Sequence, residues 1–237
     1  MYKMKLYGIL LAMAFVSGCG GIKTQAMQHS AANPIQTIAL LTIGTNDSYE
    51  YQEPGKRNTT IMGFNTGTVD RIKESVDGTI LGNTRIHMHL RSSNYSISQS
   101  LTNALKQKMA QKGIGVIGVQ TKRSGHDLLE DYKKTPSAGA DAILDVSPAN
   151  VGFREIKDDV YPLLKVRVRL VSARTKQVLY QDTVSIGDQK KSQSLANERH
   201  LVSNGLRGLL RQPETQFTAL DGAATTIATY IADQLRP

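Results

Sequence analysis

Lys165-Val-Arg-Val-Arg-Leu170 decides the fold class of this chain, because apolar and basic residues alternate strictly along it. Such a period of two is typical of a strand with one buried face. The alternation belongs to a longer stretch from Tyr161 to Ser172, which a polar turn at 173–176 separates from a second β-prone stretch, Gln177 to Ile186. The sequence therefore predicts a β-hairpin with one apolar and one cationic face.

Further strands and one clear helix precede this hairpin. The run Pro34-Ile-Gln-Thr-Ile-Ala-Leu-Leu-Thr-Ile43 is almost continuously apolar and is typical of a strand covered on both faces. The segment from Ser96 to Gly113 has apolar residues at helical spacing, with Asn94 or Ser96 as its cap and a glycine as its stop, and it predicts a helix. Two more strands are predicted at 114–119 and 140–146, with a short helix at 127–134 between them.

The remaining segments complete an α+β domain. Residues 44–93 are rich in Asn, Thr, Gly and charges and predict a β-rich insertion with strands at 59–64 and 85–91. Two helices with apolar stripes, 195–210 and 217–235, close the chain and are separated by Pro213. The expected fold is a single domain over 34–237, a mixed sheet covered by helices on at least one face.

The N-terminus has the layout of a secretory signal. Lys3 and Lys5 precede an apolar run from Leu6 to Val16, which small residues follow. This run is about half the roughly 20 residues that a transmembrane helix needs, so a signal peptide over 1–18 is expected rather than a permanent span.

Val16-Ser-Gly-Cys19 contains the single cysteine of the chain and resembles the bacterial lipobox. The resemblance implies a diacylglycerol thioether on Cys19, cleavage before it and acylation of the new N-terminus. Several acyl chains hold a protein stably on a membrane. Residue 20 is Gly rather than Asp, which in this class implies sorting to the outer membrane, facing the periplasm. Residues 19–33 lack apolar periodicity and predict a flexible tether.

Composition limits the classes of partner. The precursor has 29 basic and 20 acidic residues, and loss of the two lysines in the signal leaves 27 against 20, a net charge of +7. This surplus favours anionic partners, and the exported location argues against nucleic acid. Aromatic residues make up 5% of the chain and tryptophan is absent, which weakens a carbohydrate-stacking or single-strand-binding role.

A second resemblance runs from Ile35 to Ile186 without the insertion. Thr37-Ile-Ala-Leu-Leu41, Gly139-Ala-Asp-Ala-Ile-Leu144 and the hairpin up to Tyr180 resemble periplasmic lipoproteins related to the curli-secretion lipoprotein and the penicillin-binding-protein activators. In those families the hairpin turn has an Asp and a Thr-Gly pair. Here Ser172 stands for the Asp and Lys176 for the Gly, so the resemblance supports the fold more than a function.

Three motifs that suggest chemistry have simpler interpretations. Gly113-Ile-Gly-Val-Ile-Gly118 follows a helix instead of preceding one, so it predicts a helix stop and a strand rather than a dinucleotide site. His87 and His89 share one side of a predicted strand but have no evident third ligand, so no metal site is expected. Ser124-Gly-His-Asp127 holds the letters of a catalytic triad side by side, which is not how triads assemble.

The row of Lys165, Arg167 and Arg169 is the candidate binding surface, because three cations on one strand face attract anions. A solvated sheet face is the competing interpretation. The carboxylates of Asp141 and Asp145 have no evident general-acid partner and are read as strand-edge groups.

These features predict a non-enzymatic accessory lipoprotein that recruits, stabilises or regulates an envelope assembly through protein contacts, with no cofactor. Homo-oligomerisation is compatible with this prediction. Two alternatives stay open. One is an oligomeric secretion or pore component, in which the 44–93 insertion enters a membrane or binds a partner, and the other is an envelope hydrolase or ligand-binding protein.

Overall fold

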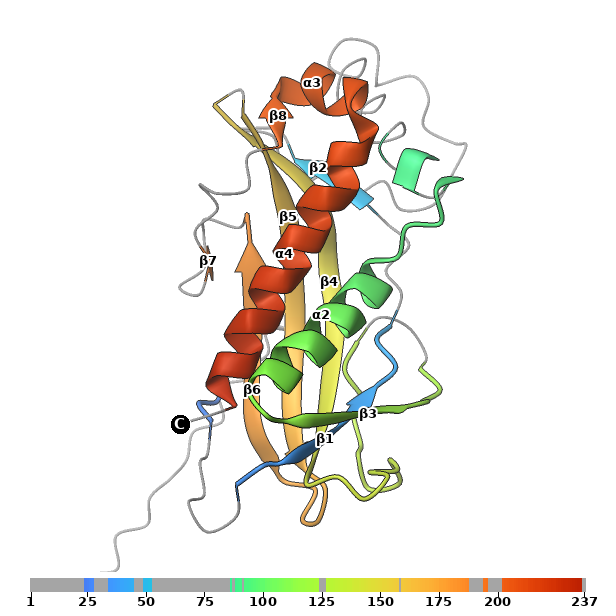
Figure 1. Cartoon of the computed structure of the whole chain (residues 1–237), viewed down its shortest axis with the longest axis vertical. Helices are drawn as coiled ribbons and strands as arrows, with labels where there is room; N and C mark the ends of the chain where they lie inside the picture. The colour runs from blue at the N-terminus through green and yellow to red at the C-terminus, as the bar shows by residue number, and fades with distance from the viewer. Residues whose placement is uncertain are drawn as a thin grey trace, which may run out of the picture.

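The computed structural model describes residues 24–27, 34–44, 49–52, 86, 88–90, 92–123, 127–157, 159–187, 194–195 and 202–235 (Figure 1). The predicted signal peptide, Cys19 and most of the 44–93 insertion, including the predicted strand at 59–64, lie outside these residues.

Eight strands form one mixed sheet with the order β3-β1-β4-β5-β6-β7, in which β2 pairs with β4 and β8 pairs with β5. Their bounds are β1 Thr37–Leu41, β2 Tyr49–Gln52, β3 Gly115–Val119, β4 Ala142–Ile156, β5 Asp159–Ser172, β6 Val178–Ile186, β7 Ser194–Leu195 and β8 Ser203–Asn204. β1 is parallel to both β3 and β4, whereas β4, β5 and β6 are antiparallel. The predicted α+β fold with a mixed sheet is confirmed.

β4 is much longer than the predicted strand, which ended at Val146. It continues through Ser-Pro-Ala-Asn150, a sequence typical of a turn, and its register with β5 shifts between Pro148 and Asn150. Proline donates no backbone hydrogen bond, and a bulge is where a strand tolerates it. Beyond the bulge β2 approaches very closely, because a Cβ at Gly152 would lie 1.8 Å from the Glu50 carbonyl oxygen.

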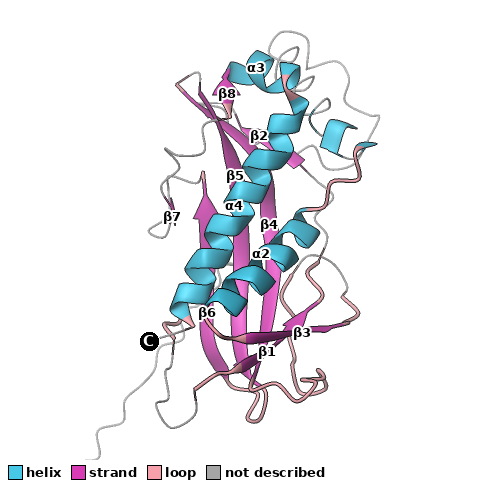
Figure 2. Ribbon diagram, in the orientation of Figure 1, coloured by secondary structure: helices cyan, strands magenta, loops and turns pink. Residues whose placement is uncertain are grey.

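Helices α2 (Ile97–Gln111) and α4 (Pro213–Gln234) lie side by side on one face of the sheet, and the short α3 (Gly205–Arg211) precedes α4 (Figure 2). The main core fills the space between these helices and the sheet. Its members include Leu101 and Leu105 of α2, Ile227 and Ile231 of α4, and Val168 of β5. None of the helices in the described part of the chain combines the length and the apolar character that crossing a bilayer demands.

α2 confirms the predicted helix and its two ends. The Ser96 side chain accepts a hydrogen bond from the Gln99 N–H, so Ser96 is the cap. At the other end Gly113 has a φ of 73°, and the Ile114 N–H donates to the Met109 carbonyl at 2.9 Å. This is the glycine-terminated stop typical of helix C-termini. The Gly-x-Gly-x-x-Gly sequence is therefore a helix stop followed by β3.

The opposite face of the sheet is covered by residues 127–140, which contain no helix. Tyr132 and Ala140 pack there with Ala39, Ile143 and Val171 in a second, smaller core. The predicted helix at 127–134 is wrong because this segment bonds to the sheet instead of to itself: the Leu129 N–H donates to a carboxylate of β4 and its carbonyl accepts from an arginine of β5.

Two other predicted elements differ. Ile86 and residues 88–90 are helical rather than extended. Ile86 and Leu90 are buried four residues apart, whereas Met88 between them is 63% exposed. The alternating apolar residues of the predicted strand 85–91 therefore do not share one face. The first C-terminal helix begins only at Gly205, and Leu195 belongs to β7.

The N-terminal residues 24–27 lie along β6. The Gln25 N–H donates to the Gln181 carbonyl at 2.7 Å, and the Gln181 N–H donates back at 3.1 Å. The Gln25 side chain reaches the Val178 carbonyl at 2.8 Å, and Met27 packs against the main core. Part of the predicted tether is therefore joined to the domain, and the rest lies outside the described residues.

Candidate functional site

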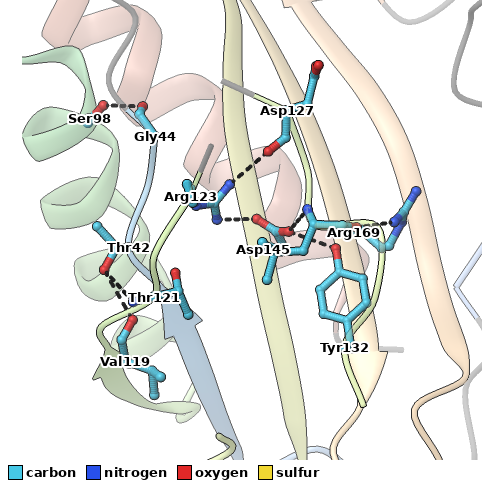
Figure 3. Close-up of polar contacts among 11 residues, drawn as sticks. Thr42, Gly44, Ser98, Val119, Thr121, Arg123, Asp127, Tyr132, Asp145 and Arg169 are labelled. Atoms are coloured by element: carbon cyan, nitrogen blue, oxygen red, sulfur yellow. Dashed lines mark hydrogen bonds and ion pairs between the residues drawn. The ribbon is translucent and has the colours of Figure 1, made fainter. Parts of the chain in front are cut away.

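Asp145 is the charged centre of a polar cluster on the sheet face opposite the helices (Figure 3). It belongs to β4 and has no solvent exposure. Its carboxylate accepts hydrogen bonds from the Leu129 N–H at 2.8 Å and the Tyr132 hydroxyl at 2.7 Å, and it forms an ion pair with Arg123. A buried carboxylate is tolerated when it is paired and hydrogen-bonded in this way. All three partners come from the covering segment, the stretch between β3 and β4, so Asp145 holds that segment against the sheet.

Arg123 reaches Asp145 because β3, β1 and β4 are parallel and their carboxyl ends point the same way. The Arg123 side chain is 6% exposed. Just before it, the Thr121 N–H donates to the Thr42 hydroxyl oxygen, and the Thr42 N–H donates to the Val119 carbonyl at 2.9 Å (Figure 3). These bonds fix the exits of β1 and β3, and Arg123 is thereby directed towards β4.

The predicted cationic row lies on β5 beside this cluster, and both of its arginines bind groups within the protein. Arg167 forms an ion pair with Asp127, whose side chain is 80% exposed. Arg169 donates to the Gln181 side chain and, at 3.0 Å, to the Leu129 carbonyl. Lys165 is half-buried and lies opposite Ser185 of β6. Both arginines thus help to hold the segment that covers the sheet.

Tyr132 lies between the two charged groups of the cluster. Burial raises the pKa of its hydroxyl, and the neighbouring Asp145 carboxylate raises it further. The Arg169 guanidinium carbon stands 5.7 Å from the Tyr132 ring centre, within the range of a cation–π contact. The hydroxyl therefore stays protonated and donates to Asp145 at physiological pH.

A second buried carboxylate, Asp182 of β6, lies on the helix side of the sheet and is 1% exposed. It accepts hydrogen bonds from the hydroxyls of Tyr180 at 3.1 Å and Tyr230 at 3.3 Å, and from the Thr24 hydroxyl at 3.3 Å. These contacts join the sheet, α4 and the N-terminal segment. Burial, followed by the Asp182 charge, raises the pKa of Tyr180.

The predicted histidine pair is divided. His87 lies outside the described side chains, and His89 stacks on Phe217 of α4 with ring centres 5.1 Å apart. Tyr95 also stacks on Phe217, at 5.2 Å, and donates to Asp221 at 2.9 Å. No group of three or more His, Cys, Asp or Glu side chains within the described ranges could hold a metal ion.

The cluster around Asp145 is suited to holding a segment in place, because its charges are paired internally. Within the described residues, three buried atoms near it have no hydrogen-bond partner: Thr121 Oγ1, Arg123 Nε and Ser147 Oγ.

Of the triad-like sequence, Asp127 pairs with Arg167, and residues 124–126 lie outside the described part. Cys19 lies outside it as well.

Sequence reasoning missed the importance of both buried carboxylates, and Asp145 is not a strand-edge group. A signal was present, since Ala142-Ile-Leu-Asp-Val146 places one acid inside an apolar run that is buried on both faces. An acid in such a position requires partners from elsewhere in the fold. The sequence could not show that Arg123 and Tyr132 supply them.

Comparisons with known proteins show only distant likenesses. No protein-family model and no curated protein matches the sequence. Among solved structures, the protein XCC0632 of Xanthomonas campestris, described as DUF330, is 10% identical over 89% of each chain, with a TM-score of 0.41. The PelC dodecamer of Paraburkholderia phytofirmans is 11% identical over 90% of this chain and 94% of that one, at 0.37. Lipoprotein GNA1162 of Neisseria meningitidis is 15% identical over 63% and 81%, at 0.25. At these TM-scores no conclusion follows from the likenesses.

Proposed function

We propose that this chain is a lipid-anchored accessory or assembly factor of the bacterial envelope, which acts through protein contacts and without catalysis. The anchor is the lipid on Cys19 of Val16-Ser-Gly-Cys19, and the domain faces the periplasm from the outer membrane. The envelope partner recognises the folded domain, and the anchor keeps the domain where that partner is.

The observation that carries this proposal is the short connection between the anchor and the domain. Four residues, Gly20 to Lys23, separate Cys19 from Thr24, which already bonds to Asp182. Fully extended, this connection spans about 18 Å. A lipid on Cys19 therefore keeps the β6 side of the domain close to the bilayer. There the domain can reach a membrane-bound partner but not a distant soluble one.

The internal pairing of charges supports a role through contacts. Arg123 and Arg167 are neutralised by Asp145 and Asp127, and Tyr132 is kept protonated. This cluster stabilises the covering segment and leaves recognition to the surface. If the row of Lys165, Arg167 and Arg169 bound an anionic partner, that partner would compete with Asp127 for Arg167.

Site-specific photo-cross-linking in living cells tests this function. A photoreactive residue would replace Asn103 or Lys106, two exposed positions on α2, in the wild-type chain and in a Cys19→Ser variant. We expect one envelope protein to be captured by the wild-type chain and much less of it by the variant, because the unanchored domain is not held beside it. Capture of lipid and self alone, or equal capture by both chains, would contradict the proposal.

A further inference from the structure

We propose that β3 is a self-pairing edge, through which two copies of this chain join their sheets in an antiparallel β3–β3 contact about a twofold axis at Ile117. β3 ends the strand order of the sheet, and among the described residues it pairs only with β1. This proposal goes beyond the function proposed above and does not depend on the lipid anchor.

The hydrogen-bonding direction of β3 follows from its contacts with β1. The Gly115 N–H donates to the Gln36 carbonyl at 2.8 Å, and the Val119 carbonyl accepts from the Thr42 N–H at 2.9 Å. Odd-numbered residues therefore turn their backbone groups towards β1. Because the direction alternates along a strand, Val116 and Gly118 turn their N–H and C=O groups outward.

The surface of β3 is that of an unprotected edge. The strand reads Gly115-Val-Ile-Gly-Val119 and has no charge, proline or bulge, the usual devices that prevent edge pairing. Gly115 and Gly118 are exposed, and a Cβ at Gly118 would meet nothing within 4 Å. Ile117 is 38% exposed, one of two large exposed apolar side chains among the described residues.

A second copy of the chain matches this edge. With the twofold axis at Ile117, Val116 of one copy lies opposite Gly118 of the other, so the outward groups form hydrogen-bonded pairs on both sides of the axis. The two Ile117 side chains then face each other as a non-hydrogen-bonded pair, with Cα atoms about 4.5 Å apart, and bury their exposed surface. In the sequence, the cations closest to β3 are Lys112, which pairs with Asp233, and Lys122 beyond the strand.

Disulfide trapping in intact cells tests the proposed register. Ile117→Cys places two thiols within the Cα separation that a disulfide requires. Gln120→Cys is the matched control, because Gln120 is exposed and near β3 but would lie about 20 Å from its counterpart across the twofold axis. Under mild oxidation we expect a disulfide dimer from Ile117→Cys and at least about tenfold less from Gln120→Cys.

The wild-type chain is a control that distinguishes failure of the self-pairing from failure of the anchor, because its single cysteine is Cys19. A dimer from the wild-type chain would show a free Cys19 thiol and contradict the anchor alone. Equal trapping at 117 and 120, no trapping at 117, or trapping of Ile117→Cys to a different protein would overturn the self-pairing.

A charge at the axis provides a second test. In the purified protein, sedimentation should give the mass of two copies for the wild-type chain and of one copy for Ile117→Lys. Two lysines facing each other across the axis would repel. Met88→Lys, at the other exposed apolar position, should leave two copies. An unchanged mass for Ile117→Lys would overturn the proposal.

Discussion

The carboxylate of Asp145 carries a charge at a position with no solvent exposure, and its partners come from a single covering segment. Arg123 supplies the opposite charge, and the Leu129 N–H and the Tyr132 hydroxyl supply hydrogen bonds. Such a site stabilises a fold only while every partner is present, because a lone buried charge is far costlier than a buried pair is favourable. The covering segment and β4 therefore depend on each other.

Asp145→Asn tests this dependence. The substitution keeps the size of the side chain and leaves Arg123 buried without its counter-charge, so we expect the free energy of unfolding to fall by about 3–5 kcal/mol. Urea denaturation measures this change. Asp127→Asn is the matched control, since the Asp127 pair is largely exposed and should cost less than about 1 kcal/mol. Equal effects of the two substitutions would contradict the role given to Asp145.

At the scale of single elements, the C-terminus of α2 shows why Gly113 is needed. With a φ of 73°, residue 113 adopts a backbone conformation that is costly for any side chain. Gly113→Ala should lower the free energy of unfolding by about 1 kcal/mol, whereas Gly118→Ala on β3 should change it by less than about 0.5 kcal/mol. Thermal unfolding checks both variants. A larger loss from Gly118→Ala would show that the strand glycine has a role that this structure does not explain.

The N-terminal segment is a second element with a testable attachment. Gln25→Pro removes the N–H that donates to Gln181 and should release residues 24–27 from β6. Hydrogen exchange at the Gln181 amide, which donates to the Gln25 carbonyl, should then become faster. Gln25→Ala keeps both backbone bonds and loses only the side-chain contact with Val178, so this amide should stay protected. Equal exchange in the two variants would contradict the attachment.

Elements with strong local signals were predictable, and elements held by distant partners were not. The β5–β6 hairpin, α2 and β1 follow from periodicity and caps, and all three are present. At the β5–β6 turn Lys176 has a φ of 58°, and Ser172 Oγ accepts from the Thr175 N–H, so local bonds close the turn. The helix prediction for residues 127–134 was wrong because Leu129 bonds to Asp145 and Arg169, which lie 16 and 40 residues away in the chain. A local sequence pattern cannot reveal such distant partners.

The candidate site was predictable only in part, for the same reason. Alternation on β5 correctly placed Arg167 and Arg169 on one face. It could not show that Asp127 and Leu129 would meet them there. Whether the row with Lys165 binds an anion stays a prediction, which depends on release of Arg167 from Asp127.

Across the whole molecule, the two faces of the sheet are covered differently. Two helices cover one face with a large apolar core, and an irregular segment held by a buried ion pair covers the other. Four described tyrosines have raised pKa values, and burial is the main cause of each shift: Tyr95, Tyr132, Tyr180 and Tyr230. Their raised pKa values link the stability of the fold to alkaline pH.

These raised pKa values make the fold less stable as the pH rises. Unfolded tyrosines lose their protons near pH 10, whereas the folded protein retains them, so stability is full below that pH and falls as pH rises above it. Each such tyrosine contributes a slope of up to about 1.4 kcal/mol per pH unit. Denaturation at several alkaline pH values should show this fall, and Tyr180→Phe should flatten the slope. Stability that is independent of pH between about 9 and 11 would contradict the burial of these hydroxyls.

The proposed lipid anchor would place the whole molecule at a membrane through one residue, Cys19, and a connection of four. Mass spectrometry of the N-terminal peptide of the protein isolated from its own membranes tests this most directly. We expect the peptide to begin at Cys19 and to carry a diacylglycerol thioether and an acylated amine. A peptide that begins elsewhere, or a Cys19 with a free thiol, would contradict the proposal that this domain works from a lipid anchor.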